Sequence, residues 1–229
     1  MKSTNHKYLA FASSFFLFSM MATASPLAAG GSTSSFTIYS GGANSYSGTF
    51  LEGNSAAVSN NLWSGVLRSG VFRSAAGTLD FLYQVSENAG SSVAITKFVN
   101  SSFEGFTTDV GIISYDFDGA GTSSVNFQSA QSNRSPLSIS RSTDGSKVAF
   151  DFGSINAVDP NYSSWIMVVR TNAVQFTAGL GQIMDKRLYN TDPYGASYQP
   201  YASGVPEPAT FVPIGVALIA FALIRRKSV

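Results

Sequence analysis

The sequence contains no cysteine, and its one histidine, His6, lies close to the N-terminus. Without cysteine the fold has no disulfide, so burial of apolar side chains must stabilise it. Catalysis by Ser-His-Asp or Cys-His groups needs an imidazole base, and ordinary zinc, copper and haem sites need imidazole or thiolate ligands. A mature chain that has lost His6 excludes these classes of enzyme and metal site. Chemistry by paired carboxylates and calcium binding by oxygen ligands remain open.

Charged residues are also scarce, at 12% of the chain, and five of the 14 basic residues lie near its two ends. When these five and Glu207 are set aside, the region from Ser25 to Gly204 has a net charge of −3. The region contains no cluster of lysine and arginine, which a protein needs to neutralise nucleic-acid phosphates. We therefore predict no nucleic-acid partner.

The first 24 residues have the three parts of a secretory signal peptide. Two lysines come first, then the run from Tyr8 to Met21, which is apolar apart from three serines, and then a group of small residues. We expect signal peptidase to cut between Ala24 and Ser25, with a site near Ala28 as the second choice. The alternative is an uncleaved membrane anchor, which the short length of the apolar run disfavours.

The C-terminal end also has three parts in order. Pro206, Glu207 and Pro208 come first, the uncharged apolar segment Ala209 to Ile224 follows, and the basic cluster stands two residues before the end of the sequence: Arg225, Arg226 and Lys227. At about 1.5 Å per residue, a helix over 209–224 covers most of a hydrocarbon core roughly 30 Å thick. The basic cluster is expected to stay in the cytoplasm, which places the rest of the chain outside the membrane, as a signal peptide requires.

This tail resembles the PEP-CTERM sorting signal of Gram-negative bacteria. The resemblance implies that an exosortase, a membrane-embedded cysteine enzyme, reads Pro206, Glu207 and Pro208, and that 209–224 is the transmembrane helix. It also implies delivery to the cell surface or to the extracellular polymeric matrix. The resemblance covers only residues 205–229 and concerns where the protein goes. The alternative is a plain single-span anchor with a chance Pro-x-Pro linker.

The region between the two ends has the period-two pattern of β-strands. Leu79 to Val85 alternates apolar and polar positions, Lys147 to Phe152 does the same, and Trp165 to Val169 is nearly all apolar. The other expected strands are Phe36–Tyr39, Ser47–Leu51, Leu62–Phe72, Ser92–Val99, Val110–Phe117, Ser123–Phe127, Leu137–Ile139 and Ala173–Thr177. Turn residues separate them. We predict an all-β fold over residues 25–184, an antiparallel β-sandwich that is jelly-roll-like.

Residues 185–204 are polar, with two prolines and four tyrosines: Tyr189, Tyr194, Tyr198 and Tyr201. This composition predicts an extended spacer between the β-sandwich and the membrane.

One short segment has the start of a calcium-binding loop. Asp116 and Asp118 stand two residues apart before Gly119, a spacing at which both carboxylates can reach one ion. A third acidic ligand is missing, and Phe127 stands where the closing glutamate would be. Because a hairpin with an Asp-Gly turn explains the pattern without a metal, we predict no metal and no cofactor, and keep these two residues as the calcium candidates.

Two further patterns suggest chemistry for the β domain. Glycoside hydrolysis needs two carboxylates facing one cleft, and the isolated candidates are Asp80, Glu87, Glu104, Asp109 and Asp151. Trp63 follows Asn60-Asn61 near the start of a strand and is the candidate for an exposed sugar contact, whereas Trp165 lies in an apolar strand and is expected in the core.

From these features we predict a structural or adhesive protein of the cell surface or extracellular matrix, which is not an enzyme. Its partners would be signal peptidase, an exosortase and the membrane. A carbohydrate-binding module of the extracellular polysaccharide matrix is the alternative, and a hydrolase with two carboxylates ranks third.

Overall fold

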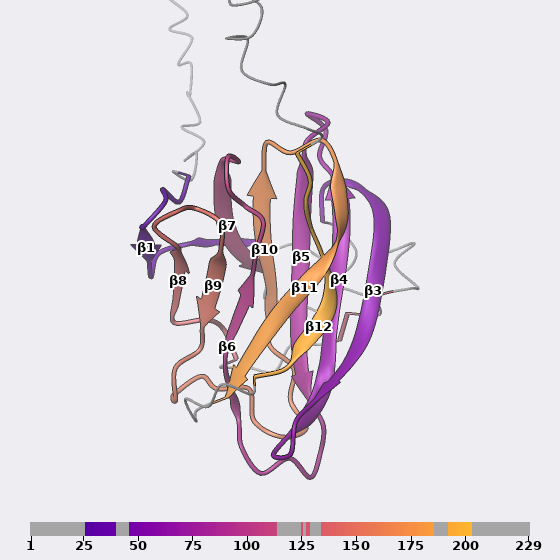
Figure 1. Cartoon of the computed structure of the whole chain (residues 1–229), viewed down its shortest axis with the longest axis vertical. Coiled ribbons are helices and arrows are strands. Elements are labelled where there is room, and N and C mark those ends of the chain that lie inside the picture. Colours follow the sequence, from indigo (N-terminus) through magenta and orange to yellow (C-terminus); the bar gives the residue numbers. More distant parts are fainter. Residues whose placement is uncertain are drawn as a thin grey trace, which may run out of the picture.

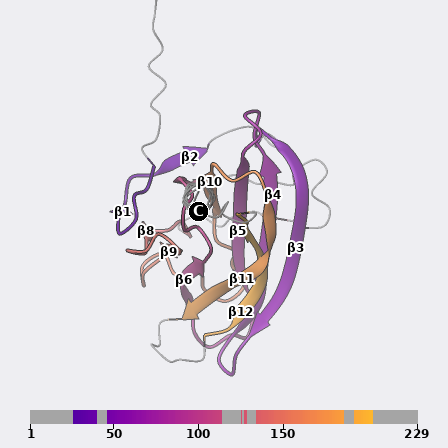
Figure 2. The ribbon, with the colours of Figure 1, turned by 45° about the horizontal axis from the view of Figure 1, so that its top comes forward.

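The computed structural model of the chain describes residues 26–39, 46–113, 125, 127–128, 134–185 and 192–202. These residues form twelve β-strands in two six-stranded sheets that pack face to face as a sandwich (Figures 1 and 2). The predicted all-β sandwich is therefore confirmed. The expected signal peptide, the cleavage site at Ala24 and Ser25, the tail at 205–229 and the calcium candidates Asp116 and Asp118 lie outside the described residues.

The first sheet, sheet A, contains six strands in the order β1 (Ser32–Thr33), β8 (Ser138–Arg141), β9 (Val148–Asp151), β6 (Ile95–Asn100), β11 (Phe176–Asp185) and β12 (Tyr194–Pro200). The second, sheet B, has the order β2 (Thr37–Tyr39), β7 (Thr108–Ile113), β10 (Ile166–Thr171), β5 (Leu79–Glu87), β4 (Ser64–Arg73) and β3 (Thr49–Ser59). Every named pair of strands is antiparallel except β2 with β7, which is parallel. The prediction of an antiparallel sandwich is wrong for that pair alone.

The period-two pattern builds the core between the sheets. On β5, Leu79, Phe81 and Tyr83 alternate toward the interior and are fully buried. Tyr83 packs on Phe98 of sheet A with their ring centroids 5.2 Å apart, and Phe98 packs on Phe150 at 6.4 Å. Burying each such aromatic side chain stabilises the fold by about 1.5–3 kcal/mol.

Sheet B also carries an apolar cluster on its outer face, away from sheet A. Its buried members are Tyr46, Phe72, Leu82, Ile113, Val125, Phe127, Ile166 and Val168. Because both faces of the sheet are covered, all nine residues of β5 are buried, including the polar ones on the outer face. Buried polar groups need hydrogen-bond or ionic partners, and this applies to the polar side chains of β5 on the outer face.

The predicted spacer is wrong for the part that the structure describes, because residues 194–200 are strand β12 of sheet A. β12 pairs with β11 along its whole length and packs on β3 and β4 of sheet B, as Figure 1 shows where β11 and β12 cross β4. Tyr198 is 9% exposed, and its carbonyl accepts a 2.7 Å hydrogen bond from the buried hydroxyl of Tyr83. Tyr194 and Tyr201 are exposed, and Tyr189 lies outside the described residues.

Small residues explain why β12 has the composition of a spacer. Gly181 of β11 stands opposite Gly195 of β12, at a place where the two sheets approach closely. A Cβ atom on Gly181 would lie 2.6 Å from Phe98, and one on Gly195 would lie 2.7 Å from Val58. Only glycine fits at these two positions. The inward-facing side of β12 therefore lacks the alternating apolar residues by which a strand is recognised in a sequence.

Both ends of the described chain lie at one end of the sandwich, which we call the proximal end. The amide of Leu27 donates to the carbonyl of Thr108 at the start of β7, and Thr108 pairs with Thr171 at the end of β10. The amide of Tyr201 donates to the carbonyl of Gln175, just before β11. The opposite, distal end carries the start of β4 and the end of β5. No helix in the described part of the chain is long and apolar enough to cross a membrane.

Candidate functional site

Cross-strand register places an arginine between two carboxylates at the proximal end of sheet B. Arg170 of β10 stands opposite Asp80 of β5 on one side and opposite Asp109 of β7 on the other. Residues directly opposite each other share a face of the sheet, so all three side chains start on the outer face. Asp80 and Asp109 were candidates from the sequence, and Arg170 was not.

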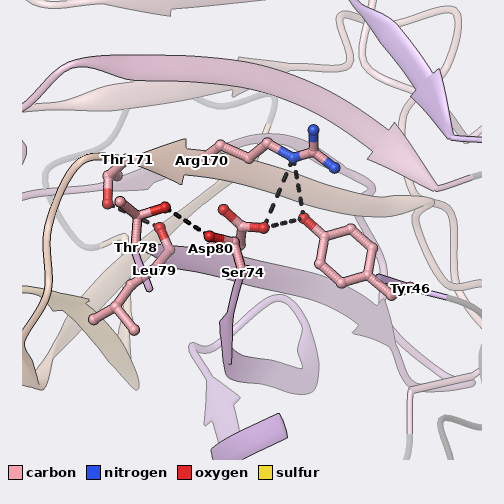
Figure 3. A network of polar contacts seen from close by, with 7 residues as sticks. All are labelled: Tyr46, Ser74, Thr78, Leu79, Asp80, Arg170 and Thr171. Carbon is pink, nitrogen blue, oxygen red and sulfur yellow. Dashed lines mark hydrogen bonds and ion pairs between the residues drawn. The ribbon is translucent and has the colours of Figure 1, made fainter. Parts of the chain in front are cut away.

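Asp80, Tyr46 and Arg170 form a closed polar network, as Figure 3 shows. The Tyr46 hydroxyl donates to Asp80 Oδ2 at 2.8 Å and accepts from Arg170 Nε at 3.3 Å. Arg170 Nε lies 3.8 Å from the same carboxylate oxygen. The Arg170 guanidinium also stacks over the Tyr39 ring, 4.2 Å from its centroid, so this cation has both ionic and aromatic partners.

Burial controls the protonation of this network. It raises the pKa of the Asp80 carboxyl above its usual value, although the Tyr46 hydrogen bond and Arg170 oppose the shift. Burial raises the pKa of Asp109 as well, and it raises the pKa of Tyr39 to about 12. Burial alone would lower the pKa of Arg170, but Tyr46, Tyr39 and Asp80 together raise it. Arg170 is therefore charged and both tyrosines are neutral at physiological pH.

A cavity of about 520 Å³ opens beside this network. Arg73, Arg170 and Asp80 contribute its charged groups, and hydroxyl-bearing residues form much of the rest of the wall. Two of these hydroxyls are held in place: Ser74 Oγ and Thr78 Oγ1 lie 2.8 Å apart (Figure 3). Because the Asp80 carboxylate is bound by Tyr46 and Arg170, the network links β5 and β10 to Tyr46 on the outer face of sheet B.

The five candidate carboxylates, all within the described residues, do not come together as the facing pair that hydrolysis needs. Asp80 and Asp109 share a face, but Arg170 lies between their strands and they line two different cavities, Asp109 one of about 570 Å³ beside Leu27. Asp151 pairs with Lys97 on sheet A at 3.1 Å. Glu104 is exposed in the turn before β7, and Glu87 is buried at the distal end.

The prediction that Trp63 is an exposed sugar contact is wrong. Trp63 is 2% exposed and belongs to the main core. The reason is local: Asn60 Oδ1 accepts hydrogen bonds from the amides of Leu62 and Trp63, at 2.8 and 3.0 Å. This Asx turn leads the chain into β4 with the indole directed inward. Trp165, expected in the core, is partly exposed.

Among the described residues, no three His, Cys, Asp or Glu side chains gather closely enough to hold a metal ion. Arg68 of β4 is a buried charged residue that the sequence interpretation missed. The sequence does carry a signal for Arg68 and Arg170, because each directly follows apolar residues of its strand, Val66-Leu67 and Val168-Val169. The register that decides what faces them could not be derived from one sequence.

No family model matches the chain, and no curated protein or solved structure is significantly similar to it.

The network predicts the effect of removing one hydroxyl. In Tyr46→Phe, the Asp80 carboxylate loses its donor and Arg170 loses an acceptor, so we expect the free energy of unfolding to fall by about 1.5–3 kcal/mol, the range for hydrogen bonds to charged groups. Chemical denaturation near neutral pH measures this change. Tyr194→Phe, on the exposed Tyr194, is the matched control, with an expected change within about 0.5 kcal/mol. Equal effects of the two variants would contradict the network.

Proposed function

We propose that this chain is an exported, non-enzymatic protein of the cell surface or extracellular matrix, with a β-sandwich ectodomain and a PEP-CTERM tail that an exosortase reads. The observation that carries the proposal is the order of three parts at 206–227: the Pro-Glu-Pro motif, an uncharged apolar segment and a basic cluster. The signal peptide at 1–24 supports it independently, because it demands the same orientation in the membrane.

The position of the chain ends is compatible with such an anchor. β12 occupies residues 194–200, so little chain separates the sandwich from the apolar segment that begins at Ala209. The six residues 203–208 span at most roughly 20 Å when fully extended. A tail inserted in the membrane would hold the proximal end close to the bilayer and direct the distal end outward.

Carbohydrate binding remains the second candidate, but its support has changed. Trp63 is in the core, so a sugar-binding surface would have to use other residues. The distal end has a polar cavity beside the buried Arg68.

The sorting proposal is tested by expression in a Gram-negative host with an exosortase and in the same host without it. We expect the wild-type chain to lose its tail and leave the inner membrane only where the enzyme is present. Glu207→Ala should accumulate in the membrane at the larger size, and the neighbouring Ser203→Ala should be processed normally. One size and one membrane location in both hosts would mean a plain anchor.

A further inference from the structure

Arg68 is a buried arginine without a counter-charge. It lies in the middle of β4 opposite Gln84 of β5 and is 6% exposed. Its Nη1 donates one hydrogen bond, of 2.7 Å, to Ser86 Oγ, while its buried Nε has no partner. No carboxylate of the described residues lies within ion-pair distance of it. Burial alone accounts for the lowered pKa of its guanidinium.

The other enclosed arginines among the described residues have an ionic partner or several acceptors, although Arg134, like Arg68, has a buried Nε without a partner. Arg170 has Asp80 and Tyr46, and Arg134 pairs with Asp159. Arg141 donates to four backbone carbonyls: those of Gly145, Leu27, Phe103 and Phe106. A guanidinium has five N–H donors, and removing it from water without partners costs free energy. Among the described arginines named here, Arg68 differs in having neither a carboxylate nor several carbonyls, because Ser86 Oγ is its one acceptor among the described residues.

A cavity of about 200 Å³ opens beside Arg68 on the outer face of sheet B, toward the distal end. Polar side chains form most of its wall: Ser86, Asn88, Gln128, Asn161, Tyr162 and Ser163. Glu87 also borders it, but strand alternation directs the Glu87 carboxyl to the opposite face of β5, where Asp159, Asp185 and the amide of Ile95 influence its pKa. The cavity thus combines one unpaired cation with neutral hydroxyl and amide groups.

We propose that the Arg68 cavity binds the carboxylate of a small polyhydroxylated acid, a uronic acid residue being the simplest example. The planar guanidinium fork matches a carboxylate in a bidentate arrangement. The surrounding amides and hydroxyls can bond to neighbouring sugar hydroxyls. The volume is below the range of about 300–1,000 Å³ for typical small-molecule sites, so one residue enters and the rest of a polymer stays outside. The proposal deepens the proposed function, on which it rests for the source of the ligand.

The binding experiment does not depend on export or sorting, so its failure is distinguishable from failure of the sorting proposal. The full chain in non-ionic detergent is titrated calorimetrically with sodium glucuronate, with glucose and with inorganic phosphate. We expect saturable binding of glucuronate, and binding of glucose and phosphate that is weaker by about tenfold or more, because neither supplies both a carboxylate and the ring hydroxyls. Binding of phosphate as tight as that of glucuronate, or no saturable binding of glucuronate, would overturn the proposal.

Two variants separate a ligand-binding Arg68 from a structural one. Arg68→Met is expected to weaken glucuronate binding by at least about tenfold and, without ligand, to raise the melting temperature, because an unpaired buried charge is replaced by an apolar group of similar length. Lys147→Met removes one positive charge from an exposed site away from the Arg68 cavity and should leave both quantities unchanged. Glucuronate should also raise the melting temperature of the wild type but not that of Arg68→Met. A lower melting temperature for Arg68→Met, with glucuronate binding retained, would make Arg68 a structural residue.

Discussion

Replacing Tyr198 with alanine is expected to lower the free energy of unfolding by about 3–5 kcal/mol, the cost of deleting a buried aromatic side chain. The ring packs edge-on against Phe176 with centroids 5.5 Å apart, and its hydroxyl donates to Glu52 Oε1 at 2.9 Å. The residue lies on a strand that pairs with β11 and contacts both β3 and β4. Its loss leaves a cavity beside Phe176 and removes the hydrogen bond to Glu52, and equilibrium denaturation of the full chain measures the effect.

The matched control is Tyr194→Ala on the same strand, where the side chain is 58% exposed. We expect that substitution to change the free energy of unfolding by no more than about 0.5 kcal/mol. A spacer at 185–204 predicts small and equal effects for the two tyrosines. That result would contradict the place of β12 in the sandwich.

The second large effect concerns Glu87, which is 3% exposed at the end of β5. Neither carboxyl oxygen accepts a hydrogen bond of ordinary geometry. Burial raises the pKa of Glu87 from 4.5 to about 7, Asp159 and Asp185 add to the shift, and Ser91 and the amide of Ile95 oppose it in part. The folded state therefore binds this proton more tightly than the unfolded state does, so stability falls as the pH rises from about 4.5 to about 7 and is level above that range.

Glu87→Gln keeps the shape of the side chain and removes its titration. At about pH 8 we expect the variant to be more stable than the wild type by about 2 kcal/mol, after allowance for water near the carboxyl. At about pH 4 the difference should be close to zero, since the wild-type carboxyl is then protonated in both states. Glu104→Gln, at an exposed turn, is the control and should follow the wild-type curve. A Glu87→Gln curve parallel to that of the wild type would show that Glu87 is hydrated and not buried.

The parts of the fold that could be predicted from the sequence are those where large apolar side chains alternate. β5, β9 and β10 were expected close to their observed bounds, because β5 and β9 direct alternate apolar side chains into the core and β10 is apolar and buried along most of its length. β12 was missed because its inward positions include Gly195 and Ser197, which the close approach of the sheets requires to be small. Because Gly195 and Ser197 are short, the buried positions of β12 do not form an apolar pattern. The tyrosine and proline residues then give the segment the composition of a linker.

The candidate sites depended on register, which one sequence does not contain. Asp80 and Asp109 were named as isolated carboxylates, but the pairing of β5, β10 and β7 places Arg170 between them. That pairing makes Asp80 part of the network with Tyr46 and Arg170 and leaves Asp109 on the other side of Arg170, beside a different cavity. Trp63 was assigned to the surface from its position after two asparagines, whereas the Asn60 side chain turns the chain inward there. The pairing of the strands, which composition does not contain, decides which of these groups meet.

The measurement that tests the central claim most directly is the intact mass of the protein recovered from the envelope and medium of its native host. The account predicts a chain that begins at Ser25 and ends in the region of Pro206 to Pro208, with all of β12 retained. A chain that lacks only the signal peptide and keeps Arg225 to Lys227 would contradict sorting and leave a simple single-span membrane protein.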